Sequence, residues 1–410
     1  MKKLLWAALL VALMLAGCGT EEIPEPTERP LIEVQVPYEE TVQTLPYADT
    51  ELVMQSMWLR EDAQARLLTE AAALFEAQTG ADVTIRWRDE NVTVENAVDT
   101  DIFQISAADF AAVPAEYMLD LTKMAAAADY DAKSHTVLRQ LVIDQCGYLG
   151  AVAEVPYLGG IYYNADVFAQ CGIDFLPRDW DGFLNLCRIL REKGWQPLTL
   201  DQEDALSAME LHLRRSVGTE EVVRMMSKGH RWDTNLPAID AMDQVAQFVR
   251  DGNMATGAPA ETPLGQNKMA WSNSAMMVGT NADCAEIEES TLIKLNWGIL
   301  PYPGTLSSGT WMTADMLMIH RDSKDAQAAF DFMMLLVTGE FDQLRTDLSG
   351  GVPADPNNAS VIVGLQDALD AAQPEPVGLM GEKQMLAAVR LWSAWYKQAG
   401  RYASLLELSK

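Results

Sequence analysis

The chain has 410 residues, a hydrophobic fraction of 49% and a formal net charge of −29. This length accommodates two domains of ordinary size, and this hydrophobic fraction supports real cores and argues against a disordered chain. A surface this acidic repels nucleic acid and anionic lipid headgroups, so we expect neither of them as a binding partner.

The N-terminus has the pattern of an export signal. Lys2 and Lys3 precede an apolar run of 12 residues, Leu4–Leu15, and the sequence LAGC then ends at Cys18. A helix needs roughly 20 apolar residues to span a membrane, whereas a shorter run with these flanks fits a secretory signal. The LAGC sequence resembles the lipobox of bacterial lipoproteins, which implies a signal peptide over residues 1–17 and lipidation of Cys18. The alternative is an ordinary signal peptide that happens to end in cysteine.

Residues 18–46 are expected to form the lipidated cysteine and a proline-rich tether. Five prolines stand among Glu and Thr between Glu21 and Pro46. This composition favours extended conformations that keep a folded body clear of a lipid surface. No later stretch is long and apolar enough to span a membrane, so we expect a chain that is anchored to the membrane through its lipid.

The first ordered segment predicts strands that alternate with a helix. Residues 52–58 are apolar, as is typical of a buried strand, and an amphipathic helix follows and ends at Gly80, where a left-handed cap fits. Residues 83–87 alternate between apolar and polar, and residues 101–106 predict a third strand. This order indicates βαβ units and a parallel sheet.

The remaining elements are expected in two blocks. In the middle segment we expect strands over residues 152–156 and 161–163 and helices over 164–171 and 180–193. After it we expect helical segments over 204–252, 326–336 and 382–400, strands over 274–279 and 296–304, and a turn over 350–354.

Several of these segments resemble the extracellular solute-binding proteins that serve sugar ABC importers. The matching stretches are F-x-x-x-TG-x-x-V from Phe75, YYNADVF from Tyr162, SAMMVG from Ser274, NWGILPYPG from Asn296 and GGVPA from Gly350. The resemblance runs from residue 52 to the C-terminus. It implies an α/β chain with the two-lobe, type II periplasmic-binding-protein fold, in which a ligand cleft lies between lobes joined by hinge crossings.

The placement of these motifs predicts the domain boundaries. The first lobe would comprise residues 47–157 plus 300–320, and the second would comprise residues 158–299 plus 321–410. Ligands favour such domain interfaces, and closure about a hinge is the usual movement of this architecture.

Sugar recognition requires aromatic faces for the sugar ring and polar groups for its hydroxyls. The candidates that the resemblance places at the cleft are Trp58, Asp109, Glu154, Tyr157, Tyr163 and Trp311. Trp58 and Asp109 follow the first and third predicted strands, and Trp311 follows the strand over residues 296–304. The other three lie in or beside the segment where the chain first passes from one lobe to the other.

Each candidate also has a structural alternative. Trp58 and Trp311 could pack within a lobe, and Asp109 could cap the helix that follows it. Tyr162 and Tyr163 alternate on a strand, so one ring should belong to the core while the other faces the cleft. Glu154 lies in the crossing strand, from which its carboxylate could face either the cleft or the core.

One departure from the resemblance bears on the ligand. Relatives often carry a tryptophan that stacks on sugar after the 274–279 strand, and here Asn281 lies in that loop within the sequence TNA. A modified sugar, a polyamine or a peptide therefore stands as an alternative to a standard oligosaccharide.

The sequence lacks motifs for redox, metal-binding or enzymatic chemistry. The cysteines after Cys18 include no C-x-x-C pair, and the histidines show no metal-ligand spacing. Cys171 and Cys187 lie on adjacent predicted helices, but buried thiols are favoured over a disulfide. No G-x-S-x-G, H-E-x-x-H or G-x-x-x-x-G-K-[ST] motif occurs. We therefore expect no metal, no cofactor and no enzymatic activity.

Together these patterns predict a monomeric, lipid-anchored protein that faces outside the cytoplasm. It would capture a small-molecule solute, a sugar or oligosaccharide, and deliver it to the transmembrane permease subunits of an ABC importer. The alternative hypothesis is a surface sensor that presents its closed state to a signalling receptor.

Overall fold

The computed structural model describes residues 45–90, 92–96, 99–199, 205–227, 230–254, 273–303 and 310–375. The predicted signal peptide, Cys18, nearly all of the tether and the predicted helix over residues 382–400 lie outside these ranges. Within them, no helix has the length and apolar character needed to cross a membrane.

Nine strands in the described ranges form one mixed sheet in the order β2-β1-β3-β8-β4-β6-β5, with β7 paired to β4 and β9 to β8. The strands are β1 (Glu51–Gln55), β2 (Asp82–Arg86), β3 (Ile102–Ser106), β4 (Ala151–Asn164), β5 (Gln196–Thr199), β6 (Ser274–Gly279), β7 (Trp297–Leu300), β8 (Thr310–Ile319) and β9 (Ala372–Pro374). The β1–β2, β1–β3, β5–β6 and β8–β9 pairs are parallel, whereas β8 is antiparallel to both β3 and β4. The expected parallel sheet is therefore present as part of a mixed one.

The helices of the described residues are α2 (Ala63–Thr79), α3 (Ala107–Ala112), α4 (Thr122–Ala127), α5 (Thr136–Cys146), α6 (Ala165–Cys171), α7 (Trp180–Glu192), α8 (Ala205–Val217), α9 (Thr219–Met226), α10 (Leu236–Arg250), α12 (Asn281–Thr291), α13 (Ala326–Val337), α14 (Gly339–Leu348) and α15 (Leu365–Ala371). Of these, α2, α6, α7, α8, α9, α10 and α13 lie where the sequence predicts helices, whereas α3, α4, α5, α12, α14 and α15 were not predicted. Short 3₁₀ turns are η1 (Arg88–Glu90), η2 (Val94–Asn96), η3 (Ala115–Tyr117), η4 (Tyr130–Ala132) and η5 (Trp232–Thr234). Gly80 ends α2 with φ +81°, as its left-handed cap position predicts.

The middle segment differs from its prediction in one respect. The two strands expected over 152–156 and 161–163 are a single strand, β4, of 14 residues. Pro156 does not interrupt it because a β-bulge between Ala153 and Val155 lies just before, and sheets tolerate proline near bulges. Gly159 does not interrupt it because the Trp311 ring on the partner strand β8 lies directly over that position.

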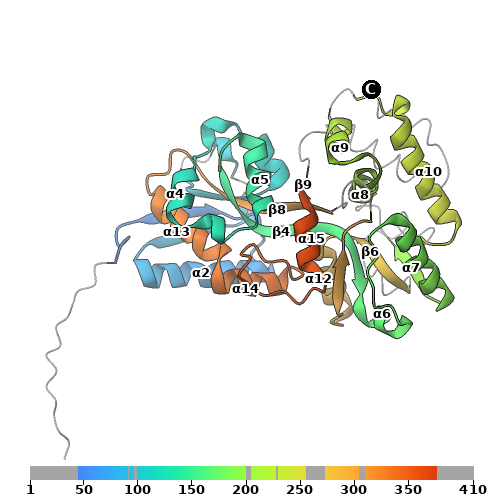
Figure 1. Cartoon of the computed structure of the whole chain (residues 1–410). Coiled ribbons are helices and arrows are strands. Elements are labelled where there is room, and N and C mark those ends of the chain that lie inside the picture. The colour runs from blue at the N-terminus through green and yellow to red at the C-terminus, as the bar shows by residue number, and fades with distance from the viewer. Residues whose placement is uncertain are drawn as a thin grey trace, which may run out of the picture. The chain divides into compact units, whose positions relative to one another are not determined.

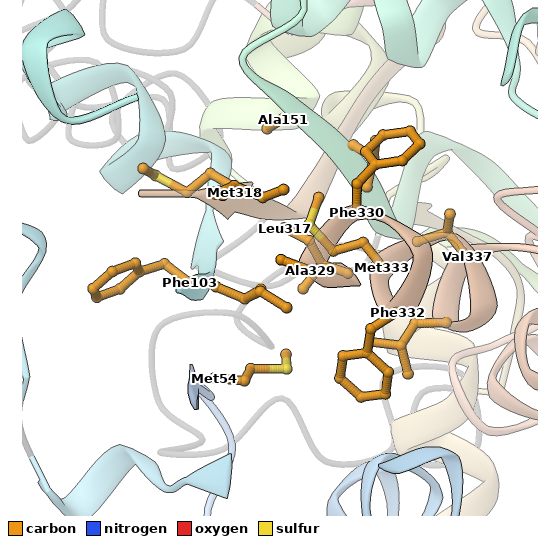
Figure 2. Close-up of a cluster of buried hydrophobic side chains, with 14 of the residues drawn as sticks. Met54, Phe103, Ala151, Leu317, Met318, Ala329, Phe330, Phe332, Met333 and Val337 are labelled. Atoms are coloured by element: carbon orange, nitrogen blue, oxygen red, sulfur yellow. The ribbon is translucent and has the colours of Figure 1, made fainter. Parts of the chain in front are cut away.

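The buried side chains form three clusters, and β4 contributes to all of them. The first core surrounds β1, β3, α2 and α13 and includes Met54, Phe103, Phe330, Phe332 and Leu317 (Figure 2). The second core includes Phe183, Leu190, Val245, Phe248 and Trp311, and the third includes Leu158, Tyr162, Met277, Met312 and Val352. In Figure 1, β4 runs between the helices α2, α4 and α13 and the helices α7, α8 and α10.

The packing of α13 differs from the predicted lobe boundary. The sequence placed residues 321–410 in the second lobe, but Phe330 and Phe332 of α13 lie in the first core, beside β1 and β3. The reason is the unusually apolar character of this helix, whose buried face covers the sheet next to α2. The other boundaries remain predictions.

The cysteines of the described chain carry free thiols, as favoured from the sequence. Cys171, Cys187 and Cys284 are buried and Cys146 is partly buried. Desolvation raises the pKa of the Cys187 thiol well above its ordinary value, so it stays protonated.

The turn after α14 depends on glycine, which yields a testable prediction. Gly350 has φ +84°, and a Cβ there would lie 1.8 Å from the carbonyl oxygen of Asn281. Both the left-handed backbone and this overlap disfavour a side chain, so we expect Gly350→Ala to lower the free energy of unfolding by at least about 3 kcal/mol in denaturant titrations.

Gly147→Ala is the matched control. Gly147 has φ +80°, but a Cβ there meets no atom within 4 Å, so only the backbone term of about 1 kcal/mol applies. Equal losses in the two variants would contradict the close approach of the Asn281 backbone to Gly350.

Candidate functional site

A buried polar network lies where β1 and β3 end. The β1–β3 pairing places Gln55 opposite Phe103, so Ser56 and Gln104 are next to each other. The Ser56 hydroxyl donates to Gln104 Oε1 at 2.7 Å, and the backbone N–H of Met57 donates to the same oxygen at 3.1 Å. In α/β sheets, ligands bind at this carboxyl edge of the strands.

Glu154 joins this network through the bulge in β4. Ala153 pairs with Met316 of β8 and Val155 pairs with Asp315, so Glu154 is the extra residue between them. A bulge redirects a side chain, and here the carboxylate, only 1% exposed, accepts a hydrogen bond from Gln104 Nε2.

Asp315 and Tyr157 form the next part of the network. The Tyr157 hydroxyl donates to Asp315 Oδ2 at 2.7 Å. Asp315 pairs with Ser106, the last residue of β3, so it lies at the same strand edge. Its exposed fraction is 6%, and Tyr157 is half-buried, so this end of the network is closer to solvent than Glu154 is.

Helix α14 brings a buried ion pair to the network. Arg345 pairs with Asp342, whose carboxylate also accepts hydrogen bonds from the backbone N–H groups of Ala354 and Asp355 and from Asn358 Nδ2. Asp342 is therefore fully satisfied as an anion. Nε and Nη1 of Arg345 are buried without a hydrogen-bond partner in the described part of the chain.

A small cavity connects Arg345 with two of the predicted site residues. Its lining includes Trp58, Glu154 and Arg345, together with Gln64 and Leu68 of α2 and Phe341 of α14. The Trp58 backbone N–H donates to Ser56 Oγ at 3.1 Å, which ties this half-buried tryptophan to the network.

Burial governs the ionisation of these groups. Desolvation raises the pKa of Glu154 to about 7, although Arg345 and the Gln104 hydrogen bond act in the opposite direction. Desolvation likewise raises the pKa of Asp315 to about 6, against the Tyr157 hydrogen bond and the Arg345 charge. The pKa of Arg345 falls to about 10 through burial, so the guanidinium keeps its charge at neutral pH. One cation, Arg345, thus interacts with three carboxyl groups, those of Glu154, Asp315 and Asp342. Its charge is already neutralised by Asp342.

Asp109 lies at the exposed end of this cluster. Its backbone N–H donates to Ser106 Oγ at 3.1 Å, and the Ser106 hydroxyl donates to Asp109 Oδ2 at 2.8 Å. Ser106 is therefore the N-cap of α3, and Asp109 lies in the first turn of that helix, so the expected capping role belongs to Ser106 and not to Asp109. The Asp109 charge also raises the pKa of Asp315, so the two carboxylates lie near each other.

The other two candidates lie in the second core. Trp311 is 3% exposed, and its Nε1 is buried without a hydrogen-bond partner among the described residues. Tyr163 is 4% exposed and stacks on Phe168 with ring centroids 4.3 Å apart. Tyr162 is also buried, so the expected alternation between core and cleft does not occur.

Sequence reasoning missed Gln104, Asp315, Arg345 and the role of Asn281. Gln104 and Asp315 interrupt the apolar runs of β3 and β8, which is a readable signal of buried polar groups. Arg345 lies in an ordinary amphipathic helix and gives no such signal. No group of His, Cys, Asp and Glu in the described ranges could hold a metal ion.

Asn281 stabilises the backbone at the position where relatives were expected to carry a tryptophan that stacks on sugar. Its Oδ1 accepts from the Leu158 N–H at 2.9 Å, and its Nδ2 donates to the carbonyl oxygens of Pro156 and Ser349 at 3.1 and 2.7 Å. The side chain therefore ties β4 to the turn after α14.

Comparison with known proteins decides the family. The model of the bacterial extracellular solute-binding proteins matches residues 59–338. The chain belongs to this family. It is therefore a solute-binding protein and not an enzyme. Among curated protein sequences, none matches the chain.

Solved structures confirm the two-lobe α/β fold. A chitin oligosaccharide binding protein matches with a TM-score of 0.65 and 17% identity over 88% of this chain and 97% of its own. Maltose-bound MalE3 of T. maritima matches with a TM-score of 0.64 and 16% identity over 88% and 98% of the two chains. RafE in complex with raffinose matches with a TM-score of 0.63 and 16% identity over the same shares. At these identities the similarity shows the fold and leaves the ligand open.

The buried carboxyl of Glu154 gives a pH-dependent prediction. Its pKa of about 7 in the folded state exceeds its ordinary value of 4.5, so the folded protein holds the proton more tightly than the unfolded chain does. The stability that this proton provides is present below about pH 4.5 and is lost as the pH rises to 7. As the pH rises from 4.5 to 8, we expect the free energy of unfolding of Glu154→Gln to increase by about 2–3 kcal/mol relative to that of the wild type. Denaturant titration of both proteins at each pH measures this change.

Glu116→Gln, at an exposed site in η3, is the control and should show no such trend. A stability difference between Glu154→Gln and the wild type that does not change with pH would show that Glu154 is ionised in the folded protein.

Proposed function

We propose that this protein is lipid-anchored, captures a sugar or oligosaccharide outside the cytoplasm, and delivers it to the permease of an ABC importer. The observation that carries the proposal is the polar cluster at the ends of β1 and β3, beside Trp58. It supplies hydrogen-bond donors and acceptors at the sheet edge where ligands of α/β folds bind.

Each part of the cluster has a role in this proposal. Trp58 offers an aromatic face for a sugar ring, and the Tyr157 hydroxyl and the Asp109 carboxylate offer groups for sugar hydroxyls. Glu154 lies behind them and accepts a hydrogen bond from Gln104, which in turn binds Ser56 and Met57 at the end of β1. Trp311 Nε1 is a second donor, on the β8 strand that crosses from the first core to the second.

Capture would proceed through movement of the crossing strands. β4 and β8 carry side chains into the first, second and third cores, so they are the segments about which lobes would close on a solute. The closed form would then dock on the permease. Solved relatives named for maltose, raffinose and chitin oligosaccharide support a sugar as the first ligand class to test.

One observation favours a second ligand class. The cluster holds three acidic groups, those of Asp109, Glu154 and Asp315, and one cation, Arg345. This excess of acidic groups would suit a solute that carries an amine, such as an amino sugar or a polyamine. The same surface could also serve a sensor that presents its closed state to a signalling receptor.

Sugar binding is tested directly by thermal unfolding of the soluble form that begins at Thr20. A sugar present at 100 times its dissociation constant should stabilise the protein by about 2.7 kcal/mol. We expect Trp58→Ala to weaken binding about ten- to hundredfold, because it removes the aromatic face, and Tyr157→Phe to weaken it about tenfold. Trp195→Ala is the control, since this half-buried tryptophan packs on the second core.

The panel is maltose, raffinose, chitin oligosaccharides, polyamines and peptides. Stabilisation by polyamines alone would replace the sugar with the second ligand class. Sugar binding that survives in Trp58→Ala and Tyr157→Phe would move the site away from this cluster.

Membrane anchoring is tested separately on the full chain. We expect the wild type expressed in bacteria to partition into the membrane fraction and Cys18→Ser to leave it, because only the cysteine sulfur can accept the lipid. A Cys18→Ser chain that stays in the membrane fraction would contradict a lipid anchor at this residue.

A further inference from the structure

Asp315 differs from the other carboxyl groups of the cluster in its access to solvent and in its pairing. It lies opposite Ser106 at the end of β3, and it keeps 6% of its surface exposed whereas Glu154 keeps 1%. Its carboxylate accepts a hydrogen bond from the hydroxyl of Tyr157, which is itself half-buried. Asp315 is thus a buried carboxyl group that keeps more solvent access than Glu154 and is hydrogen-bonded to Tyr157, a residue of the proposed sugar site.

We propose that Asp315 accepts a hydrogen bond from a hydroxyl of the bound solute and that it releases a proton when the solute binds. This inference rests on the proposed function, because it requires a solute with hydroxyl groups at the Trp58 and Tyr157 site. It adds a binding residue that the sequence did not indicate, and it adds a dependence of affinity on pH.

The charged and titratable groups around Asp315 come from three elements besides its own strand. Tyr157 and Glu154 face it from β4, Arg345 from α14 and Asp109 from α3. Arg345 favours the ionised carboxylate, but Asp342 already neutralises that guanidinium. The negative charge of Asp109 and the burial of the site favour the protonated acid, and the pKa of Asp315 is raised to about 6.

Two effects of solute binding act on this proton in opposite directions. Displacing water removes solvation from the carboxylate and favours the protonated form. A solute hydroxyl that donates to the carboxylate favours the ionised form, because hydrogen bonds to charged groups are stronger than those to neutral ones. Since Asp315 has already lost most of its solvent contact, the new hydrogen bond outweighs the further desolvation.

The consequence is that a proton competes with the solute. If the ionised form binds, the affinity for a neutral sugar should fall about tenfold between pH 7 and pH 5. At pH 6, where the carboxyl of the free protein is about half protonated, binding should release about half a proton, and at pH 8 it should release almost none.

Isothermal titration calorimetry of the soluble form measures both quantities. The probe is whichever of maltose, raffinose or chitobiose binds tightest, titrated at pH 6 in buffers with different heats of ionisation. We expect proton release by the wild type and no release by Asp315→Asn, whose affinity should no longer depend on pH. Asp82→Asn, at an exposed site on the edge strand β2, should behave as the wild type.

Infrared difference spectra provide a second readout that does not depend on heats of binding. We expect the sugar to remove a protonated-carboxyl band at pH 6 in the wild type but not in Asp315→Asn. Sugar binding without proton release and with a pH-independent affinity would overturn the role of Asp315 while leaving the proposed function intact. Failure of every sugar to bind would overturn the proposed function, and this inference with it.

Discussion

The antiparallel pairing of β4 with β8 is the constraint on which the rest of the structure depends. β4 places Val152 in the first core, Leu158 in the third and Ile161 in the second, and β8 joins it to β3. Because the cores share these two strands, a movement of one core relative to another must pass through them. Asn281 reinforces the same segment through its hydrogen bonds with the backbone of Pro156 and Leu158.

The burial of ionisable side chains around Arg345 lowers the stability of the protein. A binding protein nevertheless has a reason to retain such side chains. The Arg345–Asp342 pair is held by further donors, so Glu154 and Asp315 lack a cation of their own. Replacing such groups with apolar residues often stabilises a protein. Polar groups that violate the rules of a good core occur mainly at functional sites, where their hydrogen-bonding capacity and shifted pKa values are used.

Much of the fold was predictable from local patterns, and the reason is visible in particular elements. Gly80 marks the end of α2, Asn164 caps α6 through the N–H groups of Asp166 and Val167, and residues 274–279 form β6 as expected. The continuity of β4 was not predictable, because Pro156 and Gly159 read locally as breaks. Only the bulge and the Trp311 ring of the neighbouring strand explain why the strand continues.

The grouping of the candidate site residues was predictable in part, while their role in binding stays a prediction. Trp58, Glu154, Tyr157 and Asp109 gather around one network, whereas Tyr163 lies in the second core, where Phe168 stacks on its ring. Arg345 was not predictable because its importance comes from packing against residues far away in the sequence. The pairing of Asp315 with Ser106 likewise depends on the sheet order, which no local pattern reveals.

A crystal structure with the tightest-binding sugar of the thermal screen tests the central claim most directly. We expect a sugar ring against Trp58 and sugar hydroxyls within hydrogen-bond distance of the Tyr157 hydroxyl and the Asp315 carboxylate. A sugar bound without contact to any of these three side chains would contradict the proposed site.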